Sequence, residues 1–360
     1  MLRLIAALLL VTAPAAAQAS TDDLAQSLVD AGSPGAVVMW GEGENTLISV
    51  AGVRAEGSEA AIELNDLWHL GSNTKAMTAV LIARLVEDGV VGWDDTIAQH
   101  LGDRIDGIRP EYANATFIDL LAHRSGLPAN AGLTTLLSLS GTDAARDAPA
   151  DRIVYAEAVL TRSPAGEPGE FLYSNSGYIV AGAMLEAVTG ESWETLITRE
   201  VFEPLGMASA GFGPPGTADV IDQPRGHRAG LFGGLNAMVP DSGQSDNPPS
   251  LGPAGRVHVS MQDYARFLRL VLDGANGRDG NYLSAESWER LLTPVGDNYA
   301  LGWGISGGAL MHAGSNTMWY LQAVVWPDTD RFVVVAVNEA RSQRVQPEIG
   351  RVISTLANGR

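Results

Sequence analysis

Hydrophobic and polar residues follow one pattern at the two ends of the chain and another in its middle. Residues 36–53 are apolar and β-branched around a Gly-rich turn, and the C-terminal stretches ALMHAG, MWYLQAVVW and RFVVVAVN have the same character. Such stretches predict strands. In the middle, apolar residues recur at three- and four-residue spacing, which predicts amphipathic helices. The helical stretches are ATFIDLLAH, YIVAGAMLEAVTG, SWETLITREVF, MQDYARFLRLVLDG and SAESWERLLTP, and RSQRVQPEIGRVISTLANG closes the chain as a further helix.

Strands at both ends with helices between them predict an α+β protein whose sheet is assembled from both ends of the chain. We expect this discontinuous sheet domain over residues 20–80 and 255–360. The helices and long Pro/Gly-rich loops of residues 81–254 would form a second, inserted domain.

The first 19 residues have the features of a secretory signal. Arg3 precedes the apolar run LIAALLLV, and small residues end at Ala19. We therefore expect a periplasmic or extracellular protein. The run is too short for a spanning helix, and no later segment reaches the roughly 18 apolar residues that one needs, so we expect no stable membrane span after signal cleavage.

Charge and cysteine content exclude several partners and chemistries. A formal net charge of −19 disfavours nucleic acid and anionic lipid as partners. The absence of cysteine excludes disulfides, thiol catalysis and thiolate metal sites.

Known short motifs exclude further classes. A phosphate-binding loop needs Gly-Lys-Ser/Thr, whereas the only lysine follows Thr74. The GISGG sequence, Gly304 to Gly308, fits a nucleophile elbow, but no helical pattern follows it and no histidine occurs after His312, so we reject it. No histidine pair has metal-site spacing, and we predict neither a metal nor a cofactor. We interpret the isolated histidines as structural: His69, His100, His123, His227 and His258.

Lys75 is the only lysine among 23 basic residues, and it lies three residues after Ser72. On a helix the two side chains lie on one face, one turn apart. Lysine can act as a base towards a serine hydroxyl if burial lowers its pKa from about 10.4 towards 7, whereas arginine would need a far larger change. The alternative is an N-cap serine beside a solvated lysine, and for Ser-x-x-Lys alone this alternative is the more common case.

Two further sequence boxes favour catalysis. Tyr173-Ser174-Asn175 precedes a helical stretch, and a tyrosine hydroxyl can relay protons while an asparagine amide orients lysine and substrate. The sequence MHAGSN, residues 311–316, lies on a predicted strand, where a backbone N–H could face the substrate carbonyl and complete an oxyanion hole.

These three boxes, in this order, resemble those of the penicillin-recognising serine hydrolases, a superfamily that includes class C β-lactamases, histidine-box D-alanyl-D-alanine carboxypeptidases and family VIII esterases. LLAHRSGLP and residues 177–207 resemble further stretches of the family. The resemblance implies a β-lactamase/transpeptidase-like fold: a five-stranded antiparallel sheet flanked by helices, with an inserted all-helical domain and the site between the two.

The resemblance also implies the role of each site residue. Ser72 would be the acylated nucleophile, with Lys75 and Tyr173 as the acid/base pair. Asn175 would bind the substrate, and His312, Gly314 and Ser315 would form the third box, with the backbone N–H groups of Ser72 and Ser315 as the oxyanion hole.

Two departures from the family pattern bear on the substrate, a small ester, amide or peptide. His312 replaces the third-box lysine of class C β-lactamases, and Ala313 replaces the hydroxyl that holds a substrate carboxylate. We therefore expect esters or capped amides to be preferred, and activity on carboxylate substrates to improve towards pH 6 if His312 gains a proton. The alternatives are a D-Ala-D-Ala-type carboxypeptidase, a weak β-lactamase, or a non-catalytic binding or scaffold protein on the same fold.

Overall fold

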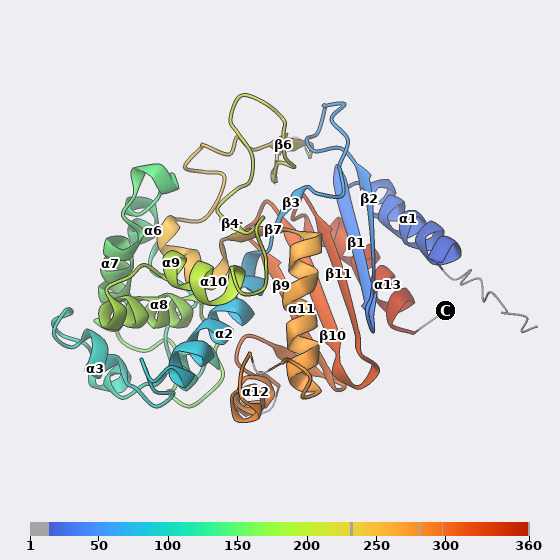
Figure 1. The fold of residues 1–360 in the computed structure, drawn as a ribbon. Helices are drawn as coiled ribbons and strands as arrows, with labels where there is room; N and C mark the ends of the chain where they lie inside the picture. Colours follow the sequence, from blue (N-terminus) through green and yellow to red (C-terminus); the bar gives the residue numbers. More distant parts are fainter. Residues whose placement is uncertain (1–13, 231–232, 281, 297, 359–360) are drawn as a thin grey trace, which may run out of the picture.

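Six antiparallel strands from both ends of the chain form the central sheet (Figure 1). The structure is a computed structural model that describes residues 14–230, 233–280, 282–296 and 298–358 of the chain. Along the sheet the order is β2-β1-β11-β10-β9-β8. The strands are β1 (Gly35–Glu42), β2 (Asn45–Gly52), β8 (Gly304–Ser306), β9 (Ala309–Ser315), β10 (Tyr320–Trp326) and β11 (Arg331–Val337).

The N-terminal hairpin joins the C-terminal strands through the β1–β11 pair, in which Ala36 lies opposite Val337 and Glu42 opposite Arg331. Both strands are buried along most of their length. Helices cover both faces of the sheet, so side chains of either orientation must be apolar. This explains why the sequence shows continuous apolar runs here instead of alternation.

Three of the described helices cover the faces of the central sheet, and most of the others form the second body of the molecule (Figure 1). Helices α1 (Pro14–Asp30) and α13 (Ser342–Ala357) pack on one face of the sheet, and α11 (Met261–Ala275) covers the other. The remaining helices are α2 (Thr74–Glu87), α3 (Ile97–Leu101), α4 (Pro110–Ala113), α5 (Phe117–Leu121), α6 (Leu133–Ser138), α7 (Ala148–Leu160), α8 (Asn175–Thr189), α9 (Trp193–Ile197), α10 (Gly252–Gly255) and α12 (Ala285–Leu292).

Two small antiparallel sheets lie outside the central one. The first has the order β3-β7-β4, with β3 (Leu67–His69), β7 (Val257–Ser260) and β4 (Gly211–Phe212). The second pairs β5 (His227–Ala229) with β6 (Leu235–Ala237). The middle of the chain is therefore mainly helical and also contains short strands.

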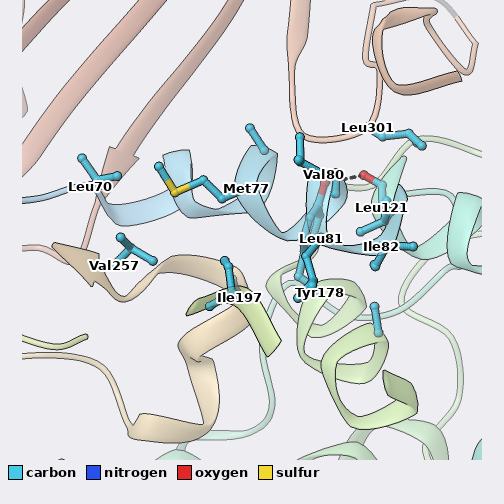
Figure 2. Close-up of a cluster of buried hydrophobic side chains, with 14 of the residues drawn as sticks. Leu70, Met77, Val80, Leu81, Ile82, Leu121, Tyr178, Ile197, Val257 and Leu301 are labelled. Carbon is cyan, nitrogen blue, oxygen red and sulfur yellow. Dashed lines mark hydrogen bonds between the residues drawn. The ribbon is translucent and has the colours of Figure 1, made fainter. Parts of the chain in front are cut away.

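Helix α2 runs through the hydrophobic core between the sheet and the other helices. Figure 2 shows Met77, Val80, Leu81 and Ile82 on this helix among side chains from several other segments, with the Tyr178 hydroxyl donating a hydrogen bond to a backbone oxygen 2.8 Å away. A helix with apolar residues on every side is stable only when fully enclosed. Such packing holds the first turn of α2, which carries Lys75, in one position.

The predicted fold class, an antiparallel sheet built from both chain ends and flanked by helices, is confirmed. The central sheet has six strands instead of the five that the resemblance implied, because the short strand β8 adds to its edge. The signal segment lies largely outside the described residues, and α1 continues past Ala19. The domain boundaries at 80/81 and 254/255 stay predictions. Among the described residues, no helix has both the length and the apolarity needed to span a membrane.

Candidate active site

Ser72 lies where the short strand β3 passes into α2. Gly71 has φ +52°, and a 3₁₀ turn over Gly71–Asn73 precedes the α-helix at Thr74. A β-carbon on Gly71 would lie 2.5 Å from the backbone nitrogen of Ser315, so only glycine allows this approach. The α-helix therefore begins two residues after Ser72, and Ser72 lies beside the end of β9.

The Lys75 side chain is fully buried, and its amine contacts three oxygen atoms. Its Nζ lies 3.0 Å from Ser72 Oγ, 2.7 Å from Asn175 Oδ1 and 2.6 Å from the backbone oxygen of Ala254. Burial lowers the pKa of Lys75 well below its usual value. A neutral amine has two hydrogens and one lone pair. The two carbonyl oxygens can accept both hydrogens, which leaves the lone pair for the Ser72 hydroxyl.

Tyr173 lies just before α8, against both Lys75 and the third box. The Lys75 amine is 5.1 Å from the centre of the Tyr173 ring, and the His123 ring packs against Tyr173 with their centres 4.3 Å apart. Burial raises the pKa of Tyr173 to about 12, although a hydrogen bond with Ser72 opposes this change. Tyr173 is therefore a neutral phenol at physiological pH and can donate a proton.

His312 lies on β9 and is 6% exposed. Its Nδ1 is 2.8 Å from the backbone oxygen of Gly302, so Nδ1 carries the hydrogen and donates it. The other nitrogen, Nε2, is then an acceptor, and it faces the Tyr173 hydroxyl at 3.5 Å.

The charge state of His312 differs from the sequence-based expectation. Burial, followed by the nearby Lys75 amine, lowers the pKa of His312 to about 3. The expectation that this side chain gains a proton towards pH 6 is therefore wrong, because the positive form would be both desolvated and next to a second basic group.

The backbones of the first and third boxes meet directly. A β-carbon on Gly314 would lie 2.1 Å from the Leu70 carbonyl oxygen and 2.7 Å from the Ser72 nitrogen. Because only glycine fits here, the end of β9 lies against the start of α2. The backbone nitrogens of Ser72 and Ser315 thus lie on adjoining segments, as an oxyanion hole requires.

A cavity of about 190 Å³ opens beside Ser72. Hydroxyl and amide side chains line most of it, and among its described lining residues none is charged. The Asn175 Nδ2 group donates to Asn130 Oδ1 at 3.0 Å. The polar residues of the lining are Ser72, Asn130, Asn175, Asn247, Ser315, Asn316 and Thr317.

All seven candidate site residues from the sequence lie around this cavity or directly behind it. Sequence reasoning missed Asn130, Asn247 and the carbonyl of Ala254. Asn130 could have been found, because it lies two residues after the family-like stretch LLAHRSGLP. Asn247 and Ala254 lie in a Pro/Gly-rich connection that has no recognisable motif. The rejected GISGG sequence forms β8 and its turn into β9, with Ser306 exposed and no helix after it. In the described part of the chain, no group of three acidic or histidine side chains is arranged to hold a metal ion.

Comparisons with known proteins agree with this geometry. A family model described as Beta-lactamase matches residues 21–357. An unguisins hydrolase, ungD, from Aspergillus violaceofuscus is 27% identical over 257 residues, which cover 67% of this chain and 42% of that protein. Penicillin-binding protein 4 from Amycolatopsis lactamdurans is 27% identical over 252 residues, which cover 66% of this chain and 59% of that protein. The chain thus spans about half the length of these relatives.

Two solved structures share the fold. A penicillin-binding protein homologue from Pyrococcus abyssi has a TM-score of 0.75 at 23% identity, and the match covers 92% of this chain and 75% of that one. The D-amino acid amidase of Ochrobactrum anthropi SV3 has a TM-score of 0.74 at 21% identity, with 94% and 98% covered. The family match over almost the whole sequence agrees with the fold and with the three adjoining boxes, and this chain belongs to the β-lactamase family of serine hydrolases.

Proposed function

We propose that this protein hydrolyses an ester or amide through an acyl-enzyme on Ser72, with Lys75 and Tyr173 as the acid/base pair. The contact set of the Lys75 amine is the observation that carries the proposal. The amine lies 3.0 Å from the Ser72 hydroxyl and 2.6 and 2.7 Å from two carbonyl oxygens, and burial lowers its pKa well below the usual value. Burial thus favours the neutral amine, which can take the proton of an adjacent hydroxyl.

In acylation, the Lys75 lone pair takes the Ser72 proton while Ser72 Oγ attacks the substrate carbonyl carbon. The negative charge passes to the carbonyl oxygen, which the backbone N–H groups of Ser72 and Ser315 stabilise. When the carbon–oxygen or carbon–nitrogen bond breaks, Tyr173 gives its phenol proton to the leaving group and takes the proton held by Lys75. The products of this step are the acyl-enzyme and a neutral alcohol or amine.

Deacylation uses the same groups in reverse order. A water molecule loses a proton towards the Lys75–Tyr173 pair and attacks the acyl carbon, and the proton finally returns to Ser72 Oγ. Asn175 bridges the Lys75 amine and Asn130 and thereby holds the base in place during both steps.

We propose an uncharged ester or amide as the substrate, acted on outside the cytoplasm. The described lining of the cavity lacks a charged side chain. Ala313, on the exposed face of β9, has no hydroxyl to hold a carboxylate. Proteins of the same fold include a D-amino acid amidase and a D-stereospecific amidohydrolase, which adds amides of D-amino acids to the substrates worth testing.

A second candidate is a D-Ala-D-Ala-type carboxypeptidase or weak β-lactamase. Relatives named as penicillin-binding proteins favour it. The neutral His312 and the absence of a hydroxyl at position 313 disfavour it.

The deciding experiment compares purified wild type with Ser72→Ala on four substrates: a p-nitrophenyl ester, a D-amino acid amide, nitrocefin and a D-Ala-terminated peptide. We expect turnover of the first two to exceed that of the others, and expect Ser72→Ala to abolish all of it. Mass spectrometry after treatment with an activated phosphonate should locate one adduct, on Ser72. An adduct on Ser306, or wild-type protein that neither reacts nor turns over any of the four, would favour another nucleophile or a non-catalytic role.

A further inference from the structure

Asp246 is a buried carboxylate that accepts hydrogen bonds from four different groups. Its side chain is 3% exposed and lies on the long connection between β6 and α10. Oδ2 lies 2.9 Å from His69 Nε2 and 3.3 Å from Arg256 Nε. Oδ1 lies 2.8 Å from Asn316 Nδ2 and 2.7 Å from the backbone nitrogen of Asn247. Each carboxylate oxygen of Asp246 therefore accepts two hydrogen bonds.

Through His69, Asp246 reaches the nucleophile segment. A carboxylate can only accept, so His69 Nε2 carries the ring hydrogen and donates it to Asp246. The other ring nitrogen, Nδ1, is then an acceptor, and it receives the backbone N–H of Gly71 at 3.1 Å. Gly71 has a positive φ and directly precedes Ser72. Asp246 thus sets the His69 tautomer that anchors this turn.

Through Asn316, Asp246 also reaches the end of β9. Asn316 Nδ2 donates to Asp246, and Asn316 Oδ1 accepts the backbone N–H groups of Met318 and Trp319, both at 3.1 Å. These bonds close a tight turn in which Thr317 has φ +75°, a strained value for a β-branched residue. Asn316 follows Ser315 directly, so the anchor lies one residue from the second oxyanion donor.

The neighbours of Asp246 keep it ionised. Although burial opposes ionisation, the His69 ring N–H, the Arg256 guanidinium and the Asn316 amide hold the pKa of Asp246 at about 2. Arg256 itself is held by two bonds to Asp143, at 2.6 and 2.9 Å. The carboxylate is therefore a fixed acceptor throughout the working pH range.

We propose that Asp246 is a positioning residue that holds the two halves of the oxyanion hole in register, through His69 on one side and Asn316 on the other. It does not touch the reacting atoms. The proposal rests on the acyl-enzyme function of Ser72, and it adds to the site a carboxylate that lies 177 residues away from His69 along the chain.

Asp246→Asn is the direct test. Each oxygen of Asp246 accepts from two donor groups. The amide nitrogen of asparagine cannot accept, so the variant loses both hydrogen bonds at whichever oxygen this nitrogen replaces. The oxyanion interaction is made mainly in the transition state, so kcat and kcat/KM should fall together by about 10- to 100-fold with KM little changed. The acid limb of the pH–rate profile should stay in place, because Lys75 keeps its contacts.

Two variants of His69 separate positioning from packing. His69→Asn can keep the acceptor for the Gly71 N–H, and His69→Gln can keep only the link to Asp246. Because each variant breaks one of the two links between Asp246 and Gly71, we expect both to lose about tenfold or more in kcat. His258→Gln is the matched control, because His258 pairs with His69 across β3 and β7 and has no bond to Gly71 or Asp246; its kcat should remain at the wild-type level.

The outcomes separate this proposal from the function on which it rests. Ser72→Ala that still turns over substrate would refute the acyl-enzyme function. With Ser72→Ala inactive, the positioning role is wrong if Asp246→Asn has wild-type kcat, raises only KM or moves the acid limb, or if His69→Asn keeps wild-type kcat. If Asp246→Asn does not fold, as judged by its thermal unfolding curve, the His69 pair alone decides.

Discussion

Replacing Lys75 by methionine removes the proposed base while keeping the length and apolar body of the side chain. Methionine fits a fully buried position without added volume. The Ser72 hydroxyl then has no basic nitrogen within 3.0 Å to take its proton. Loss of a positioned general base costs about 10²- to 10⁴-fold in rate, or roughly 3 to 5 kcal/mol of transition-state stabilisation.

Lys75→Arg tests whether a positive charge at position 75 supports catalysis without a base that can take a proton. Neutral arginine at pH 7 requires lowering the pKa by more than five units, or about 7 kcal/mol. The guanidinium also has five hydrogens to donate, whereas the amine now contacts three oxygens. We therefore expect Lys75→Arg to be at least as inactive as Lys75→Met.

The assay is kcat/KM for a p-nitrophenyl ester between pH 5 and 9. Burial lowers the pKa of Lys75, so the wild-type rate should rise with pH as this amine loses its proton and then level off. Tyr173, with a pKa of about 12, and His312, at about 3, do not titrate in this window. The acid limb should vanish from the residual rate of Lys75→Met. A folded Lys75→Met protein with more than a tenth of wild-type activity, or with the same acid limb, would refute Lys75 as the base.

Three other outcomes are expected. Because His312 has a pKa of about 3 when folded and about 6.5 when unfolded, the unfolded chain binds more protons below pH 6.5 and stability falls. When the pH falls from 7.5 to 5, the free energy of unfolding, measured with urea, should decrease by about 2 kcal/mol less in His312→Gln than in wild type. An equal decrease in the two proteins would contradict a buried, neutral His312. Gly71→Ala places a β-carbon 2.5 Å from the Ser315 nitrogen and should lower kcat by about 10²-fold without abolishing folding; wild-type kcat would show that this contact is not critical. Ala313→Thr should raise nitrocefin turnover relative to ester turnover by about tenfold, and an unchanged ratio would contradict our interpretation of the third box.

The sequence predicted those parts of the fold in which a long run of residues shares one environment. The β1–β2 hairpin was visible because its strands are eight residues each and β1 is largely buried. Strands β8 and β3 could not be predicted, because three residues are too few to show the alternation of apolar and polar positions that marks a strand. In β8 these residues are Gly304, Ile305 and Ser306. Their position follows from pairing with neighbours that lie elsewhere in the sequence.

The candidate site shows the same limit at atomic scale. The three boxes could be expected to meet because together they resemble the boxes of the penicillin-recognising serine hydrolases. The Ala254 carbonyl that accepts from Lys75 has no such pattern, since every residue has a backbone oxygen. We interpreted His69 as structural because it stands alone in sequence, and its partner Asp246 lies in a connection without periodicity. Contacts of this kind are set by tertiary packing alone.

The single lysine also makes α2 a reporter of how the molecule opens. A lysine-specific protease has one peptide bond to cut, after Lys75, and that bond lies in a helix enclosed by the core. Cleavage into two fragments therefore requires α2 to leave the core, which exposes most of its apolar side chains to water. In the regime where closing is faster than cutting, the cleavage rate measures the free energy of that opening directly. The residue proposed as the base can thus report the stability of its own surroundings, with no label added.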